Sequence, residues 1–401
     1  MKGKRDAMGK KWIFLVSFLL FLCLPVSAGA AESAESEETR QVMDTYLEFY
    51  GDMLKKGTEG LEGLSLDGEE ERSVQELLKQ AASGDLDLDV RSLLRRLLQL
   101  LLGEVYGALK MMAIILGLSV LSSYLTGLDS GFGKSAVGKA AYYAVYILIA
   151  GVASAAFYDA AGVVQGAIQN LGVFMRFIVP VMITTLLTSG AIVSASVFEP
   201  VLLSVIEIAV GVIEYGLIPL VMITTALNIV NGLSSDFKAD RLVKLLNTAV
   251  KWSLSVMLTI FISVAGLQSI ASAGVDGLTV KLSKFAASNL IPVVGGILAE
   301  SVETVMNCSV VIKNSVGVVG IIAVVLTALM PILKICAILI IFRLSAAVAE
   351  PVSDAKIITC ISRLADSISV LFSMLAAVTV MFVIILTVVV NAGSSVLMLG
   401  R

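Results

Sequence analysis

The sequence predicts an all-α protein: a polytopic membrane helix bundle that follows a small helical, exported N-terminal segment. Of its 401 residues, 57% are hydrophobic and 15% are charged, whereas soluble domains carry roughly 45–50% apolar and about 25% charged residues. Long runs of Val, Ile, Leu, Ala and Gly are almost free of charge, and about 20 such residues suffice to cross the hydrocarbon core of a membrane. The N-terminus also has the layout of an export signal.

Residues 1–30 are predicted to be a signal peptide. Five basic residues between Lys2 and Lys11 precede the apolar stretch Trp12–Val26, and small residues suited to cleavage follow it. The alternative is an uncleaved first membrane helix. In both cases the segment that follows is expected outside the cytoplasm.

Residues 31–98 are predicted to form an acidic, helical extracytoplasmic segment. Apolar residues recur in it at helical spacing, as in Val42, Tyr46, Phe49 and Met53. Two short amphipathic helices are expected, either as a docking surface for partners or as a cap on the bundle. Towards 90–98, arginines on one side and leucines on the other predict a helix along the membrane interface that leads into the first span.

The hydrophobic part of the chain contains six predicted full spans, of which the first two form a hairpin within residues 99–168. The spans are expected near residues 104–126, 138–160, 201–230, 250–273, 316–342 and 368–392. Two weaker segments, 172–198 and 288–312, are predicted to be re-entrant or broken helices. Non-helical backbone at membrane depth must be buried in protein or line a wet cavity.

The later part of the chain also predicts an internal duplication, with membrane repeat 1 at 169–277 and membrane repeat 2 at 284–393. Two prolines stand 39 residues apart in each half, and a Ser-Asp motif, at Ser235 and again at Ser353, follows the second proline. These prolines, each expected to break or kink its helix, are Pro180, Pro219, Pro292 and Pro331.

The distribution of basic residues favours two parallel repeats. With the N-terminus exported, Lys134 lies in the cytoplasm, as the positive-inside rule requires. Lys238 to Lys251 join it there if 172–198 is re-entrant, but lie outside if that segment crosses fully. The remaining basic residues expected outside, which count against this arrangement, are Lys281, Lys284 and Lys313.

Ionisable residues inside the membrane are candidate functional groups because they are costly to place there. Glu207 and Glu214 are seven residues apart and so share a helix face, and either could pair with Lys334 in the repeat-related span. The alternatives are a structural ion pair or charges that snorkel to the surface. The candidate polar or permeation residues are Arg176, Glu207, Glu214, Glu300, Glu303 and Lys334.

Enzyme chemistry is not predicted. The chain has no histidine, no phosphate-binding Gly-Lys-Ser/Thr loop and no zinc-protease motif. Its cysteines lack metal-ligand spacing. No catalytic residue, cofactor or metal site is therefore expected, and no basic patch of the kind that binds nucleic acid is present.

The whole layout, together with Pro-Val-Met-Ile-Thr-Thr at Pro180, Phe198-Glu199-Pro200 and Ala349-Glu350-Pro351-Val352-Ser353-Asp354, resembles the stage III sporulation protein AE family of endospore-forming bacteria. The resemblance implies a permease-like subunit of a channel or secretion-like apparatus, needed once the forespore is engulfed. It also implies the mother-cell-derived outer forespore membrane as the location, with other membrane subunits, an ATPase subunit and membrane lipids as partners.

Two functions therefore remain to be distinguished: a non-enzymatic subunit of a multiprotein transport channel, and a self-contained secondary transporter. A transporter needs its intramembrane charges for ion coupling, whereas a scaffold subunit is expected to tolerate their neutral replacement. The acidic exported segment favours the channel subunit, because a solitary permease has little need of one.

Overall fold

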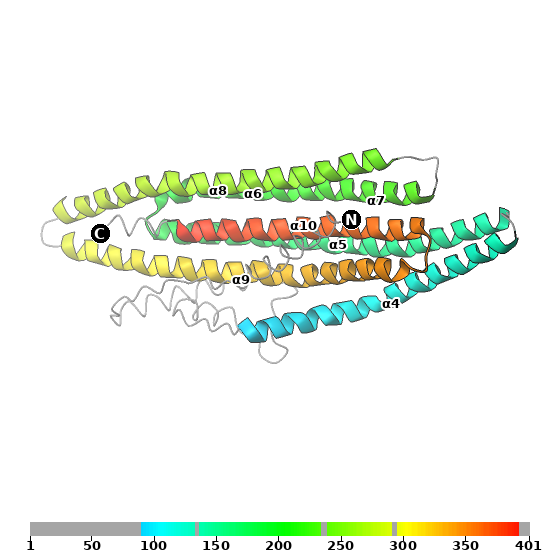
Figure 1. Cartoon of the computed structure of the whole chain (residues 1–401). Coiled ribbons are helices and arrows are strands. Elements are labelled where there is room, and N and C mark those ends of the chain that lie inside the picture. Colours follow the sequence, from blue (N-terminus) through cyan, green and yellow to red (C-terminus); the bar gives the residue numbers. More distant parts are fainter. Residues whose placement is uncertain (1–89, 133–135, 234–238, 291–294, 393–401) are drawn as a thin grey trace, which may run out of the picture.

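The computed structural model describes residues 90–132, 136–233, 239–290 and 295–392, and these form a bundle of long helices (Figure 1). The predicted signal peptide and most of the acidic segment lie outside the described residues. The helices are α4 (Val90–Phe132), α5 (Ala136–Thr188), α6 (Ile192–Gly211), the π-helical segment η1 (Val212–Leu217), α7 (Ile218–Leu233), α8 (Asp240–Leu290), α9 (Gly295–Ala349) and α10 (Ala355–Asn391).

These helices make six rods, because α6, η1 and α7 follow one another without a break. The rods alternate in direction along the bundle (Figure 1). In the described part of the chain, all six contain a stretch long and apolar enough to cross a membrane. The prediction of an all-helical, multi-pass membrane protein is thereby confirmed.

The segment 172–198 is not a separate element. Residues 172–188 continue α5, and α6 begins at Ile192 after a tight turn in which Gly190 has a φ of 86°. Glycine adopts this left-handed conformation without steric cost, and it commonly ends helices. Because α5 is a single rod, α8 begins at the same end of the bundle as α5, and no re-entrant segment is needed to bring their basic residues together.

The second weak segment, 288–312, is divided between the end of α8 and the start of α9, and Pro292 lies outside the described residues. From Gly295 to Ala349, α9 is uninterrupted. The turn between α5 and α6 thus has no counterpart inside α9, and the proposed boundaries 169 and 277 fall within helices. The internal duplication stays a prediction.

The core lies where α5, α9 and α10 pack together. Gly317 on α9 faces Val390 and Met182, so closely that an added Cβ would overlap Val390. Small residues allow membrane helices to approach in this way. Lys313, one turn earlier, is fully buried and donates a hydrogen bond to the carbonyl of Ala392 at the end of α10.

Polar contacts join four helices at the end of the bundle where α5, α8 and α10 begin, here called the basic end (Figure 1). Asp240 of α8 accepts hydrogen bonds from Asn231 at 2.7 Å and from Arg363 of α10 at 2.8 Å. Asp354 caps α10 through the Lys356 amide at 2.8 Å and accepts from Tyr142 of α5 at 3.3 Å. Basic residues concentrate in this region, as the sequence predicted: Arg241, Lys244, Lys251, Arg343, Lys356 and Arg363.

Candidate functional site

Three of the residues predicted to matter inside the membrane lie along one contact between α5 and the α6–η1 rod. Arg176 of α5 pairs with Glu207 of α6, with its Nε 2.5 Å from Oε1 and its Nη2 3.3 Å from Oε2. Such two-pronged contacts are the strongest and most directional that arginine makes with a carboxylate. Glu207 therefore has a cationic partner, as the sequence suggested, but this partner is Arg176 on α5 and not Lys334 on α9.

Glu214 lies two turns further along, in η1, and accepts hydrogen bonds from two glutamines of α5. These are Gln169, and Gln165 at 3.4 Å. Neither glutamine was predicted as a site residue. Two polar amides four residues apart lie on the same face of an apolar helix, and this pattern could have indicated them. Gln165, Gln169, Arg176, Glu207 and Glu214 are together called the polar seam.

The register of two antiparallel helices explains the polar seam. Seven residues back along α5 from Arg176 is Gln169, and seven residues forward from Glu207 is Glu214. A separation of seven is close to two helical turns, so both pairs fall on the same side of the contact. Gly172 lies between them and packs against Val210, which allows the helices to approach closely.

Glu214 is presented by an unusual piece of backbone. The π-helical segment Val212–Leu217 ends immediately before α7, whose second residue is Pro219. Proline has no amide hydrogen for the carbonyl four residues earlier, and its ring collides with that carbonyl in a regular α-helix. A widened turn relieves this conflict, and such π-bulges often occur at functional sites.

The other prolines of the prediction behave differently. Pro180 lies inside α5 and Pro331 inside α9, and both helices continue as regular α-helix on either side. Only Pro219, among the three within the described residues, is accompanied by a change of helix type. A π-helical turn thus accompanies Pro219 but not Pro331, and the kinks themselves stay a prediction.

Within the described residues, nothing covers the polar seam completely. The side chains of Arg176 and Glu207 are 43% and 56% exposed. Further along α5, near Gln165 and Gln169, Gly162 and Gly166 have open space where a side chain would be. In water, a pair this exposed contributes only about 0–1 kcal/mol, but next to lipid tails its charges are costly. The seam therefore needs a polar or protein neighbour if it lies within the membrane.

The remaining candidates lie elsewhere. Lys334 is exposed on α9 and has no ion-pair partner among the described residues, so its predicted pairing with Glu207 or Glu214 does not occur. Both carboxylates have their partners on α5 instead. Glu300 and Glu303 lie near the start of α9, but their side chains are outside the part that the structure describes.

The chemistry available at the polar seam is that of charge and hydrogen bonding. Its two carboxylates, one guanidinium and two amides can hold a polar partner or an ion, and no hydroxyl or thiol is among them. In the described segments no three His, Cys, Asp or Glu side chains converge as metal ligands would. Cys308, Cys336 and Cys360 are buried free thiols.

Comparison with known proteins gives one consistent result. A family model described as Stage III sporulation protein AE matches residues 72–393. The chain is also similar to the Stage III sporulation protein AE of Bacillus subtilis (strain 168), with 29% identity over 369 residues that cover 92% of this chain and 88% of that relative. No solved structure matches the chain.

Proposed function

Since this chain belongs to the stage III sporulation protein AE family, we propose that it is a permease-like membrane subunit of a multiprotein channel needed for sporulation after engulfment. It would lie in the mother-cell-derived outer forespore membrane, with its N-terminal segment in the space between the two forespore membranes. Its partners would be the other membrane subunits and the ATPase subunit of the same apparatus.

The observation that supports this proposal most is the exposed polar seam. An Arg–Glu pair and a carboxylate bound by two amides lie on apolar helices, and the helices that the structure describes leave the Arg–Glu pair exposed. A transmembrane helix of a neighbouring subunit would remove these groups from lipid. The open glycines Gly162 and Gly166 leave room for its backbone.

One observation favours the alternative of a self-contained secondary transporter. In transporters, helices interrupted near the membrane midplane often form the binding site, and Glu214 lies in such an interruption beside Pro219. A transporter that couples to ions would require the negative charge of Glu214. A subunit held by packing and hydrogen bonds would not.

The test compares two glycines, Gly166 beside Gln165 of the polar seam and Gly266 on α8, both of which have open space beside them. Each is changed to leucine, and the full chain is isolated from sporulating cells. We expect Gly166→Leu to lose the co-purifying membrane subunits and the heat-resistant spores, while Gly266→Leu, the matched control, keeps both. Unchanged co-purification for Gly166→Leu would exclude the seam as the subunit contact.

A third arm of the same experiment addresses the alternative function. Glu214→Gln keeps a side chain that accepts a hydrogen bond but removes the charge. Retention of both spores and co-purifying subunits supports the channel subunit. Loss of spores with intact co-purification would instead indicate an ion-coupled transporter.

A further inference from the structure

The first three turns of α8 carry two adjacent rows of exposed side chains. One row is basic, with Arg241, Lys244 and Lys251, and the other is apolar, with Leu242, Leu245, Ala249 and Trp252. Leu245 is 63% exposed and Trp252 is 68% exposed, which is unusual for side chains of this size. Together the two rows are called the α8 face.

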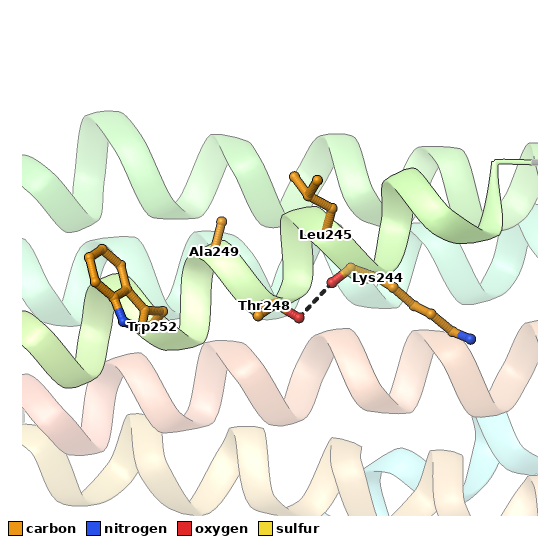
Figure 2. A pocket seen from close by; sticks show the side chains of 5 residues that line it. All are labelled: Lys244, Leu245, Thr248, Ala249 and Trp252. Atoms are coloured by element: carbon orange, nitrogen blue, oxygen red, sulfur yellow. Dashed lines mark hydrogen bonds between the residues drawn. The ribbon is translucent and has the colours of Figure 1, made fainter.

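Figure 2 shows the middle of the α8 face, where a shallow groove is lined by residues of this one helix. The Lys244 side chain extends towards the start of α8, and Trp252 lies at the other end of the groove, further along the helix. Thr248 between them is satisfied by its own helix, since its hydroxyl donates to the Lys244 carbonyl at 2.8 Å. The groove is therefore bordered by an ammonium group at one end and an indole at the other.

The basic row differs from Arg343 and Arg363 of the basic end, because none of its members has an ion-pair partner within the described residues. Arg343 pairs with Asp366 at 2.6 Å, and Arg363 pairs with Asp240 at 2.8 Å. Within the described residues no carboxylate pairs with the three basic side chains of the α8 face. They present a row of uncompensated positive charge to whatever surrounds α8.

The surroundings of α8 follow from its place in the bundle. Residues Asp240–Val264 are a candidate span, and only 11% of its most apolar window is buried, the smallest share of the six. This window of α8 thus faces mostly outward. Tryptophan is enriched at the membrane–water interface, and lysine stems extend along apolar surface towards headgroups.

We infer that the α8 face binds anionic phospholipid headgroups of the leaflet at the basic end. The ammonium and guanidinium groups would pair with lipid phosphates, and the Trp252 ring, about 10 Å further along α8 than Leu245, would lie on the acyl-chain side of these phosphates. Basic residues close to such a surface attract anionic lipid. This inference is independent of the polar seam and of the proposed function.

The chain contains only two tryptophans, Trp12 and Trp252, so a Trp12→Phe variant reports on the α8 face alone. The full chain is placed in nanodiscs of equal phosphatidylglycerol and phosphatidylcholine, in which either one or the other lipid carries bromine, a quencher of tryptophan fluorescence. We expect quenching to give a roughly fivefold excess of phosphatidylglycerol beside Trp252. The excess should shrink as salt is raised, because screening weakens exposed charge pairs.

Two double variants in the same background complete the test. Lys244→Gln/Lys251→Gln should lower the phosphatidylglycerol excess, with only Arg241 left in the basic row, while the control Arg95→Gln/Lys110→Gln, which removes the same charge from α4, should leave the excess unchanged. Equal quenching by both lipids in the unmodified face, or an excess that survives the α8 changes, would overturn the inference. Absence of quenching by either lipid would also overturn it, because protein would then cover the face.

Discussion

Opposite faces of α5 show how differently one helix can be used. Ile178 and Met182 lie against Gly320 and Gly317 of α9, and almost no space remains between the helices. The other face carries the polar seam beside two open glycines. In the core even the lysine at 313 is completely covered, whereas Arg176 is 43% exposed. Among the described helices, charge is therefore covered in the core and left exposed at the polar seam, as expected if the seam is the contact with a neighbouring subunit that we propose.

The largest effect is expected where the core covers a charge. Lys313→Ala removes a packed stem and leaves the Ala392 carbonyl without this donor, so we expect a loss of about 2–5 kcal/mol in the free energy of unfolding. Titration with SDS in mixed micelles, followed by circular dichroism, measures it. Lys313→Met retains most of the side-chain volume, so its loss of unfolding free energy should be smaller. Wild-type stability for Lys313→Ala would contradict the description of a tightly packed core.

A smaller effect is expected from one methyl group added to either face. Gly317→Ala places a Cβ against Val390 and Met182, and such overpacking costs about 1–3 kcal/mol. Gly162→Ala meets nothing and should instead stabilise by about 0.5–1 kcal/mol, because alanine is the better helix former. The same titration compares them. Equal changes in unfolding free energy at the two glycines would contradict the difference in packing between a tightly packed face and an open one.

The smallest effect is expected at the polar seam itself. Arg176→Gln breaks the exposed pair with Glu207, and pairs of this exposure contribute about 0–1 kcal/mol. Thermal unfolding of the isolated chain should shift by no more than a few degrees. A larger drop in the unfolding temperature would mean that the polar seam stabilises the single chain, and would count against its role as a contact with a neighbouring subunit.

Much of the architecture could be predicted from the sequence, because apolar runs and basic clusters act locally. The six spans and the basic end follow from the length of those runs and from the positions of Arg241, Lys244 and Arg363. The path of 172–198 could not be predicted. Pro180 suggested a break there, but a helix can lose one hydrogen bond within a bundle and continue, and the turn came instead at Gly190.

The site was predicted only in part for a related reason. Arg176, Glu207 and Glu214 stand out as charges in apolar sequence, but their partners depend on the register between two helices, which no local pattern fixes. The expected pair with Lys334 was wrong for this reason. The widened turn at Glu214 had a local signal in Gly216 and Pro219, which weaken a regular helix at this point.

The longest rods are much longer than the membrane is thick. α5 has 53 residues and α9 has 55, so each measures about 80 Å, while the hydrocarbon core is about 30 Å thick. Tilts of membrane helices rarely exceed roughly 40°, which leaves a substantial part of each rod standing in the adjoining aqueous layers. A soluble protein in such a layer can then bind the bundle without contacting the lipid.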